Sequence, residues 1–158
     1  MSRFMDVSLQ IAIADDDRSS RAILRQILQK LGHTIVAEVD SGWSLVEQCA
    51  VTNPDVVITD NRMADISGLD AAAEICRHRQ LPIILVSAFC DPDLVRIAEQ
   101  KHVSMYLVKP IHEAHVAAAL SRCIAQRDAS GFLEEPGAVI LQSSEVADSR
   151  SRLVPRDR

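Results

Sequence analysis

Five short apolar runs alternate along the chain with longer segments of helical pattern. The runs occupy residues 9–14, 34–39, 55–59, 82–86 and 104–108, and polar or turn-forming residues bound each of them. Apolar residues within a run are continuous rather than alternating, which is typical of strands buried on both faces. Such strands, joined by helices, form a parallel sheet with helices on both sides. The pattern therefore predicts an α/β fold of five βα units, a doubly wound three-layer sandwich.

The segments between the runs carry the start signals of helices. Asp17 precedes the first helical segment and is interpreted as its N-cap rather than as a metal ligand. Ser41 precedes the second segment, and Asp91 followed by Pro92 opens the fourth. The third segment, "GLDAAAEICRHR", is rich in Ala and Leu and has basic residues in its last turn, so helices are predicted between all the strands.

The composition of the chain changes after residue 127. Residues 7–127 are predicted to form the domain, and residues 128–158, rich in Ser, Pro, Gly and charge, are predicted to form a flexible tail. One apolar cluster, "GAVILQ" at 137–142, leaves open an extra strand or a contact with a partner.

Composition and charge exclude several classes of function. A chain of 158 residues with a formal charge of −5 offers no basic stripe for nucleic acid. The four cysteines lie far apart without zinc-site spacing, so free thiols are expected, and the five histidines are expected at the solvated surface. No signal peptide and no membrane-spanning stretch is recognisable, which predicts a cytoplasmic protein without a membrane partner.

Polar residues at the predicted strand ends form the candidate site. Asp15 and Asp16 follow the first strand, Asp60 the third, Ser87 the fourth and Lys109 the fifth. The carboxyl ends of parallel strands meet at one edge of the sheet, where ligands bind. Three carboxylates so close would repel one another by about 1 to 4 kcal/mol per pair, so a cation is needed. Mg²⁺ suits such a set of oxygen ligands, with Mn²⁺ as the alternative. A divalent ion, a hydroxyl and an ammonium group around one carboxylate suit phosphoryl transfer to Asp60. By contrast, Glu38 and Asp40 after the second strand are interpreted as loop solvation.

These residues give the chain a resemblance to the receiver domain of two-component response regulators. The motifs are "ADDD", "DVVITDNRM…G", "SA" and "KP" at the successive strand ends, over roughly residues 7 to 127. The resemblance implies a flavodoxin-like strand order, 2-1-3-4-5, and Asp60 as phospho-acceptor. It also implies Mg²⁺ held by Asp15, Asp16, Asp60 and the backbone carbonyl of Arg62. Lys109 would contact the phosphoryl group, next to a cis Lys–Pro bond.

The same resemblance assigns a conformational switch. Ser87 would move toward a phosphoryl oxygen, and the ring of Tyr106 would turn inward into the vacated space. Arg62 and Phe89 flank the acceptor, and we expect them to tune the attack of water on the acyl phosphate. The family usually has proline where this chain has Ala64, so the loop after the acceptor is expected to be somewhat looser.

The expected function is that of a stand-alone response regulator. A sensor histidine kinase or histidine phosphotransfer protein would supply the phosphoryl group, and the chain would catalyse only its own phosphorylation and dephosphorylation. "SAFCDPDLVRIAE" and "MYLVKPI" are most similar to receivers of RNA-binding antiterminator regulators, so a degenerate RNA-binding output within 128–158 is the alternative. A phosphatase-type enzyme is disfavoured, because it needs an acid two residues past the nucleophile, where this chain has Arg62.

Overall fold

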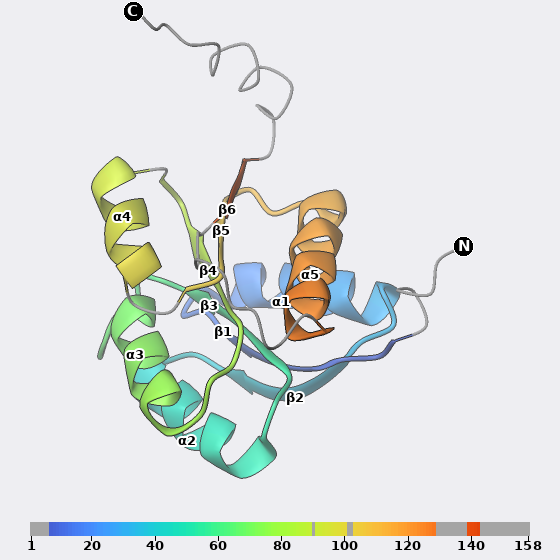
Figure 1. Ribbon diagram of the computed structural model, residues 1–158, viewed down its shortest axis with the longest axis horizontal. Coiled ribbons are helices and arrows are strands. Elements are labelled where there is room, and N and C mark those ends of the chain that lie inside the picture. Colours follow the sequence, from blue (N-terminus) through green and yellow to red (C-terminus); the bar gives the residue numbers. More distant parts are fainter. Residues whose placement is uncertain (1–6, 90, 101–102, 129–138, 143–158) are drawn as a thin grey trace, which may run out of the picture.

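The computed structural model describes residues 7–89, 91–100, 103–128 and 139–142. Strands and helices alternate through the chain, as the apolar runs predicted (Figure 1). The elements are β1 (Gln10–Ala14), α1 (Arg18–Lys30), β2 (Thr34–Val39), α2 (Gly42–Thr52), β3 (Val56–Asp60), α3 (Gly68–His78), β4 (Ile83–Ser87), α4 (Pro92–Gln100), β5 (Met105–Val108), α5 (Glu113–Asp128) and β6 (Val139–Gln142).

The strands form one sheet in the order β2-β1-β3-β4-β5-β6, and every neighbouring pair is parallel. The first five strands confirm the predicted order 2-1-3-4-5. This order places the ends of β1 and β3 side by side, with β4 and β5 following along the same edge. The sheet therefore brings together the strand ends that carry the candidate residues.

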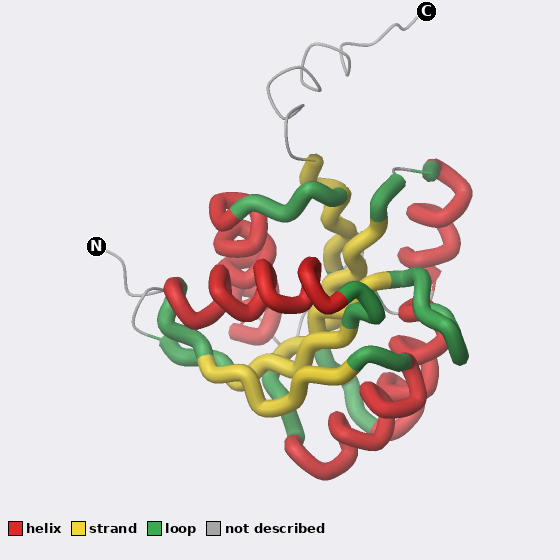
Figure 2. Tube along the Cα trace, turned by 180° about the vertical axis from the view of Figure 1, so that it is seen from behind, coloured by secondary structure: helices red, strands yellow, loops and turns green. Residues whose placement is uncertain are grey.

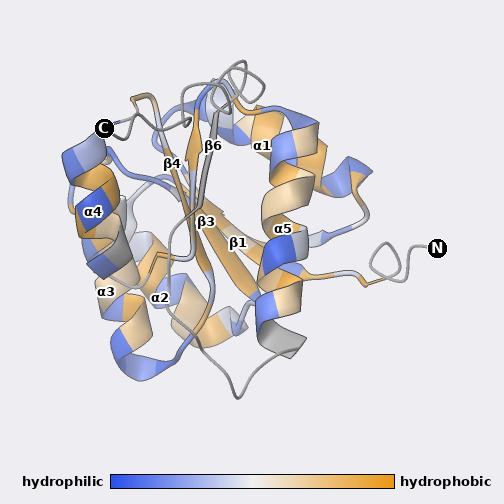
Figure 3. Cartoon of the chain, turned by 45° about the horizontal axis from the view of Figure 1, so that its top comes forward, coloured by the Kyte–Doolittle hydropathy of each residue, from blue (hydrophilic) through white to orange (hydrophobic). Residues whose placement is uncertain are grey.

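Helices cover both faces of the sheet, with α1 and α5 on one side and α2, α3 and α4 on the other (Figures 1 and 2). Successive residues of a strand point to opposite faces, so each strand contributes to two cores. In β1, Ile11 and Ile13 pack with α1 and α5, whereas Ala12 and Ala14 face the other three helices. Figure 3 shows the resulting hydrophobic strands between helices whose outer surfaces are largely hydrophilic.

The sixth strand lies within the segment for which the sequence favoured a flexible tail. Its residues pair with β5 in register, from Met105 opposite Val139 to Val108 opposite Gln142. The apolar cluster thus forms the extra strand that its composition left open. Residues 129–138 and 143–158, and with them most of the proposed RNA-binding alternative, lie outside the described part of the chain.

Local contacts test several smaller predictions. The side chain of Asp17 accepts a hydrogen bond from the backbone N–H of Ser20 at 3.1 Å, which confirms Asp17 as the N-cap of α1. His33 is half-buried and its Nδ1 accepts from the N–H of Leu9 at 3.1 Å, so the surface prediction was wrong for this histidine.

None of the helices in the described ranges is long and apolar enough to cross a membrane.

Candidate functional site

The candidate site lies at the carboxyl edge of the sheet, where four neighbouring strands end. Asp15 and Asp16 directly follow β1, Asp60 is the last residue of β3, Ser87 is the last of β4, and Lys109 directly follows β5. The backbone N–H of Lys109 donates to the carbonyl of Ser87 at 2.8 Å, which holds the ends of β4 and β5 level. The polar residues at these strand ends therefore lie along one edge of the sheet, as predicted.

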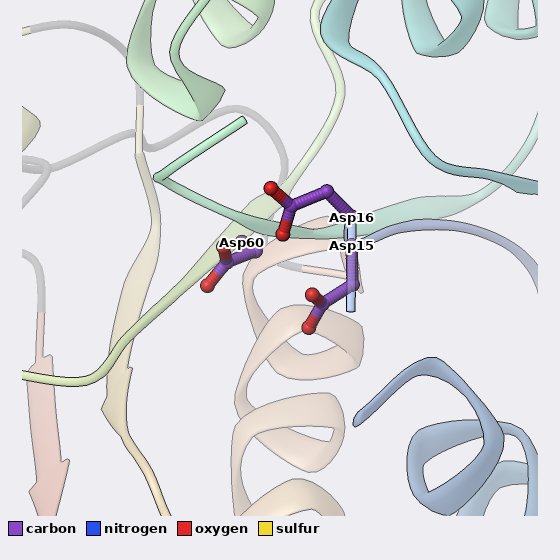
Figure 4. A group of neighbouring side chains, drawn as sticks. All are labelled: Asp15, Asp16 and Asp60. Carbon is purple, nitrogen blue, oxygen red and sulfur yellow. The ribbon is translucent and has the colours of Figure 1, made fainter. Parts of the chain in front are cut away.

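Three carboxylates converge at this edge. Oxygen atoms of Asp15, Asp16 and Asp60 all lie within 4.8 Å of one another (Figure 4). Asp15 and Asp60 are buried, whereas Asp16 is exposed. The Nζ of Lys109 lies 3.2 Å from Asp15 Oδ2 and 3.2 Å from Asp60 Oδ1. One lysine thus faces three acids, and the cluster keeps an excess of negative charge.

Burial and nearby charges shift the pKa values of Asp60 and Lys109. Burial raises the pKa of Asp60, the nearby carboxylate of Asp15 raises it further, and Lys109 opposes both. Burial disfavours the charge on Lys109, but Asp60 and Asp15 outweigh it and hold the pKa of Lys109 above 10.5. Lys109 is therefore a permanent cation at neutral pH. An oxygen-only donor set with excess negative charge is the type that binds hard divalent ions such as Mg²⁺.

Ser87 and Tyr106 are connected through the turn that follows β4. The hydroxyl of Tyr106 donates to the carbonyl of Phe89 at 2.9 Å, and the N–H of Phe89 donates to Ser87 Oγ at 3.2 Å. The Tyr106 side chain is fully buried, whereas Phe89 is 62% exposed. The guanidinium carbon of Arg62 lies 5.9 Å from the centre of the Phe89 ring, within the range of a cation–π contact. Arg62 and Phe89, predicted to flank the acceptor, therefore contact each other.

The loop between β3 and α3 is tied to the start of α2. The carboxylate of Asp65 accepts from the N–H of Gly42 at 2.9 Å and from that of Trp43 at 2.8 Å. These bonds, that to Trp43 first, lower the pKa of Asp65 to about 2. Asp65 thereby restrains the loop that contains Ala64, which the resemblance led us to expect to be looser; this contact was not foreseen from the sequence.

The start of α3 packs directly on the end of β3. A Cβ atom on Gly68 would lie 2.3 Å from the carbonyl oxygen of Asp60, so any larger residue would force the backbone apart. The N–H of Gly68 donates to the carbonyl of Asn61 at 2.8 Å. Glycine at this position therefore lets the helix approach the residue that carries the candidate nucleophile.

The structure adds Arg21 and Glu38 to the surroundings of the site. Arg21 Nη1 donates to the backbone carbonyl of Asp15 at 2.7 Å, and its Nε lies 3.2 Å from Glu38 Oε2. The interpretation of Glu38 as loop solvation was therefore wrong. An acid at the end of a strand beside β1, facing an arginine in the first turns of α1, is a signal that becomes readable once the strand order is assigned.

A pocket opens beside Lys109, between the start of α1 and the segment after β5. Its volume is about 390 Å³. Its walls are formed by Ser20, Ile23, Ala88, Lys109, Pro110 and Ile111. The peptide bond between Lys109 and Pro110 is cis, as the resemblance implied.

A family model for the response regulator receiver domain matches residues 11–121. The chain belongs to the response regulator receiver family. Members of this family in two-component systems are signalling domains rather than conventional enzymes.

Individual relatives and structures agree with this assignment. The receiver is 34% identical over 120 residues to the transcriptional regulatory protein PdtaR of Mycobacterium tuberculosis, matching 76% of this chain and 58% of PdtaR. It is 32% identical over 105 residues to the chemotaxis protein CheY of Pseudomonas aeruginosa, matching 65% of this chain and 85% of CheY. The solved receiver domain of the M. tuberculosis NarL response regulator superposes with a TM-score of 0.71 at 25% identity, covering 75% of this chain and 97% of that one.

Proposed function

We propose that this receiver accepts a phosphoryl group on Asp60 from a sensor histidine kinase or a histidine phosphotransfer protein. The supporting observation is the position of Asp60 at the end of β3, 3.2 Å from the Nζ of Lys109 and within 4.8 Å of two further carboxylates. A nucleophile beside a fixed cation and a metal-binding set of acids is the arrangement that phosphoryl transfer requires.

Asp15, Asp16, Asp60 and the backbone carbonyl of Arg62 would hold Mg²⁺, or Mn²⁺ in its place. When bound, the ion neutralises charge on the phosphoryl oxygens and on the attacking carboxylate. In the free protein Lys109 lies 3.2 Å from a carboxylate oxygen of each of Asp15 and Asp60, so it neutralises part of their charge and orients them. Asp16, the exposed acid, leaves the site open to solvent.

In the transfer step, a carboxylate oxygen of Asp60 attacks the phosphorus of a phosphohistidine. The P–N bond breaks, the imidazole leaves with a proton from water, and an acyl phosphate forms on Asp60. Lys109 and Ser87 bind the phosphoryl oxygens during this step. Attack of water on the acyl phosphate later releases inorganic phosphate, so the chain catalyses only its own phosphorylation and dephosphorylation.

Phosphorylation replaces the single negative charge of the Asp60 carboxylate with about −2 on the phosphoryl oxygens and so changes what Ser87 contacts. A Ser87 hydroxyl that turns toward a phosphoryl oxygen leaves the N–H of Phe89, which now donates to it at 3.2 Å. The turn that carries Phe89 also accepts the bond from Tyr106. Ser87 and Tyr106 thereby form a switch that shifts a pre-existing equilibrium at α4, β5 and α5, the surface that binds a downstream protein.

The phosphodonor would approach over α1 and the segment after β5. Ile23 on α1 is 51% exposed and, with Ile111, lines the pocket beside Lys109. An exposed apolar side chain next to a pocket suits a contact with a protein phosphodonor rather than with a small-molecule one. The receiving face and the output face then lie on different elements.

The proposal is tested by intact mass after incubation with acetyl phosphate and Mg²⁺. Wild-type protein gains the mass of one phosphoryl group, whereas Asp60→Asn stays unmodified. Equal modification of both proteins, or of neither, overturns the proposal.

A further inference from the structure

Asp15 and Asp16 are consecutive, and this creates a geometric problem. Successive side chains of a strand point to opposite faces, yet oxygens of both residues lie within 4.8 Å of Asp60. Because β1 ends at Ala14, regular strand geometry fixes neither acid, and the direction of the peptide group between Asp15 and Asp16 decides where both carboxylates point. That peptide group consists of the carbonyl of Asp15 and the N–H of Asp16.

Arg21 binds this same peptide group. Its Nη1 donates to the Asp15 carbonyl oxygen at 2.7 Å, across the first turn of α1. On its other side, Asp15 is bound through its own N–H to the carbonyl of Val39 at 3.2 Å. The backbone around the two acids is thus held by β2 at one peptide group and by Arg21 at the next.

Arg21 is itself fixed by an ionic chain. Its Nε lies 3.2 Å from Glu38 Oε2, and its side chain is only 18% exposed. Arg25, one turn further along α1, binds the same carboxylate of Glu38 at 2.7 and 3.0 Å. Because the guanidinium is planar, engaging Nε with Glu38 also sets the direction in which Nη1 donates.

We propose that Arg21, oriented by Glu38, is a positioning residue that holds the Asp15–Asp16 peptide group in the conformation that binds the metal ion. The inference rests on the proposed function and assigns a role to two residues outside the acidic cluster. It concerns the affinity of the site for Mg²⁺, which is measured without phosphorylation.

Positioning and simple electrostatics predict opposite results here. Arg21 is a cation near a cation site, so on charge alone its removal strengthens Mg²⁺ binding. If Arg21 positions the acids, its removal weakens binding, because partners that orient metal ligands typically contribute about tenfold or more to affinity. Arg21→Lys keeps the charge but loses the planar fork, so it separates geometry from charge.

The experiment measures the Mg²⁺ dissociation constant of the full chain by calorimetry, and by the fluorescence of Trp43, the single tryptophan. Trp43 is suited to this because its backbone N–H donates to the carboxylate of Asp65 in the loop after β3. The variants are Arg21→Lys, Arg21→Gln, Glu38→Gln and the Arg21→Gln/Glu38→Gln double variant. Arg77→Gln, an exposed arginine paired with Glu74 on α3, is the control for loss of one positive charge.

We expect about tenfold weaker binding for Arg21→Lys and Arg21→Gln, and similar weakening for Glu38→Gln. The double variant should be no weaker than Arg21→Gln, because both residues act through one contact. Arg77→Gln should match wild type. Should Arg21→Gln fail to fold, Arg21→Lys carries the test.

Two failures are distinguishable. Wild-type affinity or tighter binding in the Arg21 variants overturns the positioning role and leaves the proposed function standing. A wild-type protein that binds no Mg²⁺ overturns the proposed function and this inference together.

Discussion

The hydroxyl of Tyr106 donates a hydrogen bond to the backbone carbonyl of Phe89 at 2.9 Å, joining β5 to the turn after β4. Tyr106→Phe keeps the buried ring and removes the hydroxyl that makes this bond. We expect a loss of about 1 kcal/mol in the free energy of unfolding, measured by urea titration. Phosphorylation by acetyl phosphate should proceed at the wild-type rate, since the hydroxyl is directed at Phe89. Unchanged stability would show that the bond is not formed in solution.

Arg62 and Phe89 should set the lifetime of the acyl phosphate. The guanidinium carbon of Arg62 lies over the Phe89 ring, 5.9 Å from its centre, and we expect this pair to hinder the approach of water to Asp60. Arg62→Ala and Phe89→Ala should each shorten the lifetime severalfold, followed as decay of the phosphorylated mass. Val51→Ala, which changes an apolar residue 78% exposed at the end of α2, is the control. A lifetime that none of these variants alters would count against the tuning role.

His33 should make the stability depend on pH. Burial lowers the pKa of His33 below 6.5, and the neutral ring accepts a bond from the Leu9 N–H. The folded protein therefore binds this proton less tightly than the unfolded chain does. The stabilisation is complete above about pH 6.5 and is lost as the pH falls from there through the folded-state pKa.

The measurement is the urea midpoint between pH 5 and 8 for wild type and for His33→Gln. Glutamine offers an acceptor that does not titrate, so the wild-type loss of stability below pH 6.5 should be smaller in the variant. Parallel pH profiles of the two proteins would exclude His33 as the source.

The pairing of β6 with β5 can be tested by proline substitutions at two adjacent positions of β6. Neighbouring residues of a strand direct their N–H groups to opposite edges, so only one of Ile140 and Leu141 donates toward β5. Ile140→Pro and Leu141→Pro therefore act as test and control for each other. One of the two should speed amide hydrogen exchange in β5, and the other should leave it close to wild type. Wild-type exchange in both would mean that β6 does not pair with β5 in solution.

Much of this architecture was predictable because burial leaves a simple trace in sequence. Continuous apolar runs identified the first five strands, and the polar residues at their ends identified Asp15, Asp16, Asp60 and Lys109, whose convergence follows from strand order alone. β6 was harder to predict, because a four-residue apolar cluster suits a strand, a partner contact or a tail equally well.

The contacts that the sequence did not reveal depend on three-dimensional neighbours. Glu38 and Asp65 look like ordinary loop acids, and only the packing of β2 against α1, and of the β3–α3 loop against α2, gives them partners. His33 likewise accepts a hydrogen bond from the backbone N–H of Leu9, which lies 24 positions away in the sequence.

A crystal structure of the protein with beryllofluoride and Mg²⁺ is the most direct test of the proposed phosphoryl-transfer site. We predict the beryllium complex on a carboxylate oxygen of Asp60, the ion on Asp15 and Asp16, and the Nζ of Lys109 on a fluoride. An unmodified Asp60 beside an empty acidic cluster, or beryllofluoride bound at another carboxylate, would contradict it.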